Sequence, residues 1–334
     1  MKRLMILVMA FILAAVGAPV EPFSYGDVVD NQKQYEYMLQ YKLFGEDYLK
    51  IGKNDNITDK SGWNGSANYI SIKDEVTLGG PILAGTTITA GNGLKSLTGP
   101  IIAKSFTMGN DNGSYLPGTM CLEDVNVSPS VETIVKRSEG VIVDACPLEA
   151  DPPVDLTIPT ISWPDTITQS IIIPDRGKKI IDIPDTDYYD IYLNKITTGT
   201  EDTLFVRMKD GGTITRFFVK DGITLGNHTV INVMYRTADG DSDLSQDRYR
   251  GNLLFYTTSD FTLKNSDNKQ GALQGTFIST AKISLISNIN FAGQLIAKEL
   301  EIGDDFDGKN FRFVKFDPDT IDVRLDKYGG LREN

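Results

Sequence analysis

Two stretches of the chain repeat each other without a gap. Residues 99–109 read GPIIAKSFTMG and residues 293–303 read GQLIAKELEIG, so both keep the terminal glycines, the central Ile-Ala-Lys and apolar residues at matching offsets. A looser copy begins at Gly80, ahead of the first stretch, and another begins at Gly275, ahead of the second. The resulting period of about 20 residues is typical of a solenoid, in which each unit packs only on its neighbours.

The repeat unit indicates which solenoid to expect. It holds short aliphatic runs such as Ile82-Leu83 and Phe277-Ile278, a small residue, and then a second run with alternating apolar positions. Runs of this length between Gly, Asn and Asp turns are strands and are too short for helices. We therefore predict an all-β, right-handed parallel β-helix of about nine or ten coils, roughly 40–50 Å long at about 4.8 Å per coil. A β-sandwich also alternates strands and turns and is the alternative.

If the two repeated stretches are equivalent coils, their side chains have equivalent surroundings. We expect Ile102 and Ile296 to point into the coil, and Lys104 and Lys298 to point into solvent.

The coils extend through most of the chain, with additions at both ends and in the middle. In residues 26–42, helical spacing of Tyr35, Met38, Leu39 and Leu43 predicts a short amphipathic helix that caps the open end of the first stack. Both cysteines and a cluster of prolines interrupt the pattern in the middle. The expected parts are a signal peptide (1–18), an N-terminal cap (19–42), the first coils (43–109), a disulfide-bearing excursion or linker (110–165), the main coils (166–316) and a polar C-terminal tail (317–334).

The first residues predict export. Lys2 and Arg3 precede an apolar run over 4–16, and the small residues Gly17 and Ala18 follow, with cleavage equally compatible after either one. The run is shorter than the roughly 20 residues of a membrane span. We therefore expect a Sec-exported bacterial protein, secreted or at the cell surface, with no transmembrane span in the mature chain. An uncleaved N-terminal anchor is the alternative.

The chain has two cysteines, Cys121 and Cys146, and both lie in the segment that interrupts the coils. In an exported protein, such a pair most simply forms one structural disulfide. A redox-active pair is the other interpretation, although such pairs usually lie closer together in sequence.

Charge and histidine content exclude several classes of function. The net charge is −12, which argues against binding of nucleic acid, and the single histidine, His228, removes most zinc sites and most Ser–His catalysis. No cofactor is expected except calcium. Asp239, Asp241 and Asp243 alternate as at the start of an EF-hand loop, but the glycine and glutamate required later in such a loop are missing. A solvated acidic loop is the alternative.

Two further groups of side chains are candidates for chemistry on sugars. The first contains carboxylates that would line one face, as glycoside hydrolysis requires, although a solvated face explains them as well: Asp182, Asp185, Asp187 and Asp190. The second contains aromatic rings able to stack on sugars, with core packing as the alternative: Trp63, Trp163, Tyr188, Tyr189 and Tyr192. The residues that would contact a carbohydrate are not fixed by the sequence.

The order of these segments resembles a known group of proteins. Segments 43–52, 80–84, 188–222 and 275–298 are similar to those of bacterial exported β-helix surface proteins of the choice-of-anchor or pilus-associated, adhesin-like kind, and the resemblance covers about 40–316. It implies a structural or adhesive role without enzyme activity, and a cell-surface or extracellular polymer as partner, with polysaccharides among the candidates. A secreted β-helix lyase or hydrolase acting on polysaccharide, and a noncatalytic carbohydrate-binding protein, remain alternatives.

Overall fold

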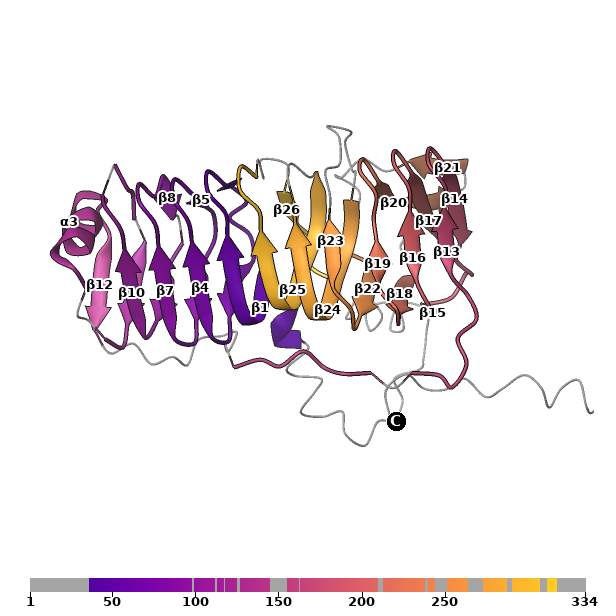
Figure 1. The fold of residues 1–334 in the computed structure, drawn as a ribbon, viewed down its shortest axis with the longest axis horizontal. Helices are drawn as coiled ribbons and strands as arrows, with labels where there is room; N and C mark the ends of the chain where they lie inside the picture. The colour runs from indigo at the N-terminus through magenta and orange to yellow at the C-terminus, as the bar shows by residue number, and fades with distance from the viewer. Residues whose placement is uncertain are drawn as a thin grey trace, which may run out of the picture.

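The structure, a computed structural model, describes residues 36–97, 99–111, 113–116, 118–124, 127–144, 155–161, 163–209, 213–237, 240–243, 251–263, 273–286, 290–306 and 311–316. The described chain is an all-β protein dominated by one large sheet of mainly parallel strands (Figure 1). Parallel pairing makes the alternative of a β-sandwich wrong, because the sheets of a sandwich are antiparallel. The signal peptide and the C-terminal tail that the sequence predicts lie outside the described residues.

The first half of the chain forms a regular ladder. Its strands are β1 (Tyr41–Ile51), β2 (Asn56–Ile57), β3 (Trp63–Ser66), β4 (Tyr69–Ile72), β5 (Thr77–Leu78), β6 (Ile82–Ala84), β7 (Thr87–Ala90), β8 (Ser96–Leu97), β9 (Ile101–Ala103), β10 (Ser105–Met108), β11 (Thr119–Leu122) and β12 (Val141–Asp144). Strands one repeat apart pair in parallel along three columns, β3–β6–β9, β4–β7–β10 and β2–β5–β8. The repeat spacing seen in the sequence is therefore the distance along the chain from one strand to its neighbour in the ladder.

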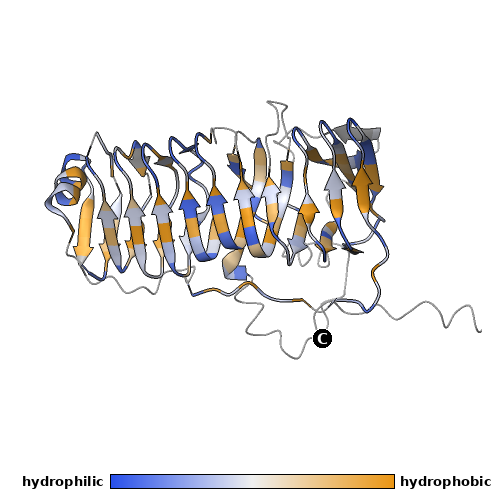
Figure 2. Cartoon of the chain, viewed as in Figure 1, coloured by the Kyte–Doolittle hydropathy of each residue, from blue (hydrophilic) through white to orange (hydrophobic). Residues whose placement is uncertain are grey.

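The second half forms longer and less regular rungs. Its strands are β13 (Ile171–Ile173), β14 (Lys178–Asp182), β15 (Tyr188–Leu193), β16 (Ile196–Thr198), β17 (Thr203–Lys209), β18 (Ile214–Val219), β19 (Ile223–Thr224), β20 (Val230–Thr237), β21 (Gly240–Asp243), β22 (Leu253–Thr257), β23 (Phe261–Leu263), β24 (Leu273–Leu285), β25 (Phe291–Ile302) and β26 (Phe311–Phe313). The pairing is again parallel, except that β20 and β21 form an antiparallel hairpin. Figure 2 shows that hydrophobic residues gather in the strands of both halves while the turns are mostly hydrophilic.

The two halves meet at β1. Leu43 of β1 pairs with Asn64 of β3 on one side and with Leu295 of β25 on the other. The first strand of the described residues therefore lies in the middle of the ladder, beside a strand from near the other end of the chain (Figure 1). We call this β1–β25 junction the seam.

The seam corrects the predicted N-terminal cap. Residues 36–38 are helical and Met38 and Leu39 are buried, as their spacing suggested, but the edge of β1 that they were expected to cover is occupied by β25. These two residues pack against the flank of the ladder instead. The local repeat could not reveal this, because its period does not state which coils from the two halves become neighbours.

A helix that the sequence analysis missed lies at the far end of the first half. Helix α3 (Pro129–Arg137) begins at Ser128, whose side chain accepts a hydrogen bond from the backbone N–H of Val131, and it packs beside β12 (Figure 1). Proline in the first turn and an N-cap serine are standard signals for the start of a helix. They fall within the segment 110–165, where β11 and β12 also continue the ladder, with Cys121 paired to Ile102.

Side chains alternate between two apolar clusters, one on each side of the strands. Ile101 and Leu295 point into the main core, whereas the next residues, Ile102 and Ile296, belong to a second cluster on the outer face. The prediction that these two isoleucines point into the coil was therefore wrong by one residue, because neighbours in a strand face opposite sides. The outer apolar cluster contains Met38, Leu39, Tyr41, Phe44, Leu83, Leu156, Ile158, Ile214, Phe218, Leu254, Tyr256, Ile278, Ile296 and Phe316, with partly buried neighbours such as Ile102, Trp163 and Tyr192.

Corresponding residues of the two repeats still have similar surroundings. Lys104 and Lys298 are both exposed, as expected. The glycine that starts each repeat is required by a close approach of the neighbouring rung. A Cβ on Gly293, whose φ is +149°, would lie 1.8 Å from the carbonyl oxygen of Gly275, and one on Gly99 would lie 2.3 Å from the backbone of Gly80.

Polar side chains are also buried within the ladder. Lys42 has no exposed surface, and its Nζ donates hydrogen bonds to the carbonyl oxygens of Asp59 and Gly79, the latter at 3.0 Å. Asn64 Nδ2 donates to the same Gly79 oxygen at 2.9 Å. Burial lowers the pKa of the Lys42 amine to about 8, with the nearby Asp59 opposing that shift. Side-chain donors to backbone carbonyls thus close this corner of the ladder.

Candidate functional site

Of the two cysteines in the predicted disulfide, only Cys121 lies among the described residues. Cys121 lies in β11, is almost fully buried, and pairs with Val143 of β12. Cys146 lies outside the described residues, shortly after Val143 in the sequence. The bridge between Cys121 and Cys146 therefore stays a prediction.

The predicted calcium ligands are likewise only partly placed. Asp241 and Asp243 belong to β21, which pairs with β20 in an antiparallel hairpin, whereas Asp239 lies outside the described residues. Within the described part of the chain, no three His, Cys, Asp or Glu side chains converge in a way that would hold a metal ion. A calcium site at Asp239, Asp241 and Asp243 stays a prediction.

Three of the four carboxylates considered for sugar hydrolysis, those of Asp182, Asp185 and Asp190, form ion pairs with basic residues of neighbouring strands, whereas Asp187 forms none within the described residues. Asp182 forms an ion pair with Arg207, and the hydrogen bond from Arg207 lowers the pKa of the Asp182 carboxyl. Asp185 forms one with Lys209 at 2.9 Å. Arg216, on β18, binds Asp190 of β15 through two hydrogen bonds, of 2.7 and 2.8 Å. A general acid needs a raised pKa, so the Asp182–Arg207 pair shifts that carboxyl in the opposite direction.

Several aromatic residues of the outer apolar cluster gather on neighbouring strands β15, β18 and β22. Tyr192 stacks on Phe218 with ring centroids 5.0 Å apart, Phe218 lies 6.0 Å from Tyr256, and Tyr256 lies 6.4 Å from Trp163. Tyr188, on the same strand as Tyr192, is 44% exposed and lies beside Arg216. Of the rings proposed from the sequence, Trp163, Tyr188 and Tyr192 therefore lie on one face; Tyr189 is also exposed on β15, and Trp63 packs half-buried elsewhere in the cluster.

A segment between the two halves lies across this face. Residues 155–161, which we call the strap, run beside the ladder (Figure 1) and bury Leu156 and Ile158 in the outer apolar cluster. Two hydrogen bonds fix it: Ile158 N–H donates to Glu46 Oε2 at 2.9 Å, and Tyr256 Oη donates to the Pro159 carbonyl at 3.0 Å. Burial raises the pKa of the Tyr256 hydroxyl to about 12, so it stays protonated as the donor.

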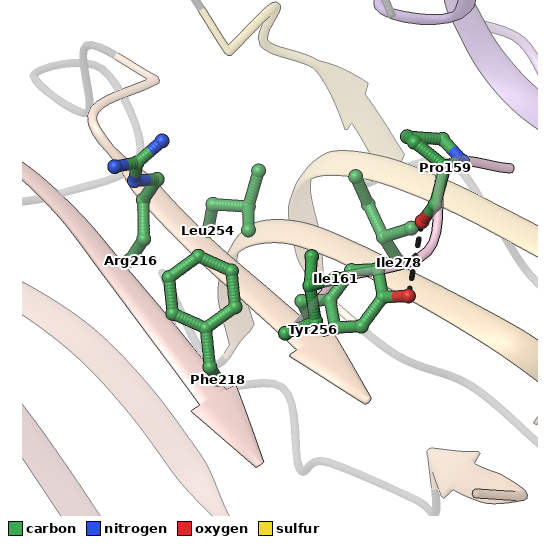
Figure 3. Close-up of a pocket in the computed structure, with 7 residues that line it drawn as sticks. All are labelled: Pro159, Ile161, Arg216, Phe218, Leu254, Tyr256 and Ile278. Atoms are coloured by element: carbon green, nitrogen blue, oxygen red, sulfur yellow. Dashed lines mark hydrogen bonds between the residues drawn. The ribbon is translucent and has the colours of Figure 1, made fainter. Parts of the chain in front are cut away.

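A groove remains between the strap and the strands. It is lined by Pro159, Ile161, Arg216, Phe218, Leu254, Tyr256 and Ile278. Figure 3 shows the rings of Phe218 and Tyr256 between Arg216 on one side and Pro159 on the other. The Arg216 guanidinium also lies 5.2 Å from the ring of Tyr188 and 5.6 Å from that of Phe218. The apolar and aromatic side chains that line the groove are themselves almost fully buried, and Arg216 lies at its edge beside the exposed Tyr188.

A different long face of the ladder carries a column of hydroxyl groups. One outward position in successive strands is occupied by Thr197, Thr224, Thr262 and Ser284 in the second half and by Ser71, Thr89 and Thr107 in the first half. The column ends in the second half at Ile172, which is exposed. The strands that carry them are about 4.8 Å apart, and Thr107 Oγ1 donates a hydrogen bond to Thr89 Oγ1 at 3.5 Å. We call these seven residues the hydroxyl column.

Charged residues interrupt the hydroxyl column at the seam. Lys50 pairs with Glu301 in the register, and Glu301 accepts hydrogen bonds from Lys50 at 3.0 Å and from Lys282. Burial alone would raise the pKa of the Glu301 carboxyl, but the hydrogen bonds from Lys282 and Lys50 outweigh it and lower that pKa to about 2. Tyr48 donates to Glu299 at 2.6 Å, and burial together with this bond raises the pKa of Tyr48. This network ties the two halves together.

Sequence reasoning missed Arg216 and the hydroxyl column. The column would have been visible by writing the strands in register, because Thr-Ile-Thr at 87–89 and Ser-Phe-Thr at 105–107 share one offset. Arg216 gave no such signal, since it lies in a different repeat from Asp190 and the strap.

No helix in the described part of the chain has the length and apolar character needed to cross a membrane. Searches of family models, of curated proteins and of solved structures find no match to this chain.

Proposed function

We propose that the chain is an exported, right-handed parallel β-helix that acts as a structural and adhesive surface protein without catalytic activity of its own. Its partner is a cell-surface or extracellular polymer, bound by many weak contacts along the outer faces. The resemblance of segments between residues 40 and 316 to adhesin-like surface proteins favours the same role.

The pairing of the strands supports the solenoid. Ile70 pairs with Ile88 in the first half and Ile196 pairs with Ile223 in the second, and both pairs are parallel. In each case the chain returns to the same column after roughly 20–30 residues, a repeat length typical of solenoids. Connections between parallel strands of one sheet are right-handed in nearly all proteins. From Val143 to Tyr192 the outer column crosses ten strand spacings, about 48 Å at about 4.8 Å each.

The hydroxyl column is the observation that carries the adhesive role. Each Ser or Thr hydroxyl has one donor and two acceptor sites, and the regular spacing places these hydroxyls against a polymer that also repeats, although Thr107 already donates to Thr89. A single such bond contributes little in water, but several that form together raise the overall affinity greatly.

The test measures binding after stepwise removal of these hydroxyls. The purified mature protein is incubated with intact cells and with insoluble polysaccharides, and the bound fraction is compared among the wild type, Thr89→Ala, and the triple variant at Thr89, Thr107 and Thr224. All three side chains are exposed. A triple alanine variant at Thr133, Thr200 and Thr258, which are also exposed but lie outside the column, is the matched control.

We expect a small loss for the single variant, a larger loss for the triple variant and none for the control. Complete loss with one substitution, or equal loss in the control, contradicts binding by summed contacts. New reducing ends or unsaturated products from the polysaccharide, abolished by replacing one carboxylate, would establish the enzyme alternative instead.

A further inference from the structure

We propose that the open end of the second half is the interface of a symmetric dimer, in which β14 pairs antiparallel with β14 of a second copy of the chain. Strands β13, β14 and β15, which we call the end coil, pair on one side with β16, β17 and β18. The described residues place no strand against their other side, which faces the end of the ladder (Figure 1). This proposal goes beyond the proposed function, because it does not depend on what the outer faces bind.

The two ends of the ladder differ. At the end of the first half, helix α3 lies beside β12, and Val131, Ile134 and Val135 of α3 are buried in the main core (Figure 1). At the other end, Ile172 and Ile180 of the end coil are 59% and 40% exposed. A filament needs two ends that fit each other, whereas a helix covers the core at one end here. Two open ends that pair with each other instead close the assembly at two copies.

The backbone groups of β14 that face the open edge follow from its hydrogen bonds to β17. The Ile183 N–H donates to β17, and the Gly177 carbonyl accepts a hydrogen bond from β17. Successive residues of a strand point their N–H and C=O groups to opposite sides. The N–H and C=O groups of Lys178, Ile180 and Asp182 therefore face away from β17, toward the open edge.

The sequence of β14 is self-complementary when two copies run antiparallel. A two-fold axis at Ile180 places this residue opposite Ile180 of the second copy, and it places Lys178 opposite Asp182. The three residues with outward backbone groups then face one another, as the hydrogen-bonded pairs of an antiparallel ladder require. The Asp182 side chain is 56% exposed although it already pairs with Arg207. Lysine on an edge strand normally discourages pairing, whereas here each Lys178 meets a carboxylate.

The same axis also matches the neighbouring strands of the end coil. The positions eight residues before and after Ile180 are Ile172 in β13 and Tyr188 in β15, and both side chains are exposed. Because the two coils run in opposite directions, β13 of one copy faces β15 of the other, and Ile172 comes opposite Tyr188. Aromatic and β-branched residues are favourable partners across an antiparallel pair.

The experiment measures the mass of the full mature chain by light scattering between about 1 μM and about 1 mM, the range in which small interfaces associate. Lys178→Glu sets a glutamate opposite Asp182 at both contacts of the dimer, and Asp182→Lys sets a lysine opposite Lys178. An equimolar mixture of the two variants restores opposite charges at both contacts. Lys104→Glu, at an exposed lysine of the first half, is the matched control.

We expect the wild type and Lys104→Glu to approach the mass of two chains as the concentration rises. Each charge variant alone should need an about tenfold higher concentration to dimerise, and the mixture should regain the wild-type behaviour. If Asp182→Lys does not fold without its contact to Arg207, Ile180→Lys and Ile180→Asp test the same register, because their charges attract across the axis only when the two are mixed.

The mass of one chain at every concentration overturns the inference, and so does a mass that grows beyond two chains, which assigns the edge to a filament. Unchanged dimerisation of both charge variants also overturns it. Hydrogen exchange of the peptide that contains Ile180 distinguishes a second copy from a segment of the same chain. Protection that increases with protein concentration supports the dimer, whereas equal protection at every concentration, with the mass of one chain, assigns the edge to the chain itself and overturns the proposal.

Discussion

The Asp55 carboxyl is buried at the seam in an environment that disfavours its charge. It has no exposed surface, Oδ1 accepts a hydrogen bond from the Phe306 N–H at 2.9 Å, and Oδ2 has no hydrogen-bond partner within the described structure. Burial is the main reason that its pKa rises from 3.8 to about 7, and the nearby charges of Asp304 and Asp305 add to it, against the backbone hydrogen bonds that lower it.

The size of this effect follows from the pKa values. The pKa of the Asp55 carboxyl is about three pH units higher in the folded chain than in the unfolded chain. This difference corresponds to about 4 kcal/mol in the free energy of unfolding. Because the folded pKa is the higher one, the folded state binds more protons between about pH 4 and 7. The free energy of unfolding therefore falls by up to that amount as the pH rises through this range, and it stays low above pH 7.

Asp55→Asn removes the charge while keeping the acceptor for Phe306. The amide leaves an unsatisfied N–H, which costs about 1–3 kcal/mol, so the variant should exceed the wild type by about 1–3 kcal/mol at pH 8 and fall below it by about 1–2 kcal/mol at pH 4. Urea unfolding at each pH from 4 to 8 measures this difference. Asp221→Asn, at an exposed position of the second half, is the control, because Asp221 does not contribute to the Asp55 shift. A difference between Asp55→Asn and the wild type that does not change with pH would refute the reasoning.

Three further predictions concern stability and covalent structure. Phe255→Ala removes the central ring of an aromatic stack in which Phe217 and Phe277 lie 4.9 and 4.8 Å away, and we expect a loss of about 3–5 kcal/mol in urea unfolding, with a loss below about 1 kcal/mol counting against the stack. Gln294→Leu leaves two backbone carbonyls and one N–H without their buried partner, so it should lower the free energy of unfolding by about 2–4 kcal/mol, whereas an unchanged thermal midpoint would contradict this role. Peptide mapping without reducing agent should recover Cys121 and Cys146 in one linked fragment; both as free thiols would disprove the bridge.

The sequence was sufficient to predict the spacing of the repeated strands. It was not sufficient to predict that β1 and β25 become neighbours. The spacing of Gly80 and Gly99 equals the register of β6 and β9, because each rung repeats the same local geometry. The pairing of Leu43 with Leu295 had no local signal, since it joins positions near opposite ends of the chain whose patterns would suit any other rung equally well.

The candidate site shows the same limit. Trp163, Tyr188 and Tyr192 could be named from their residue type alone. The groove itself depends on where the strap runs along the ladder and on the pairing of Arg216 with Asp190. Both depend on contacts between residues far apart in the sequence. A one-residue error for Ile102 and Ile296 arose because both faces of these strands are apolar, so alternation could not show which face is the core.

The seam also determines when the protein can finish folding. β1 is among the first of the described strands to leave the ribosome, yet its partner β25 is among the last, so this edge of β1 stays open until nearly all of these strands have emerged. Contacts of such high sequence separation form slowly, and an open strand edge is prone to pair with other chains. A chain truncated before residue 291 would keep that edge permanently and lack the partner that closes the ladder. The junction at the centre of the ladder is thus the last step of its assembly, and nascent chains need protection there until β25 arrives.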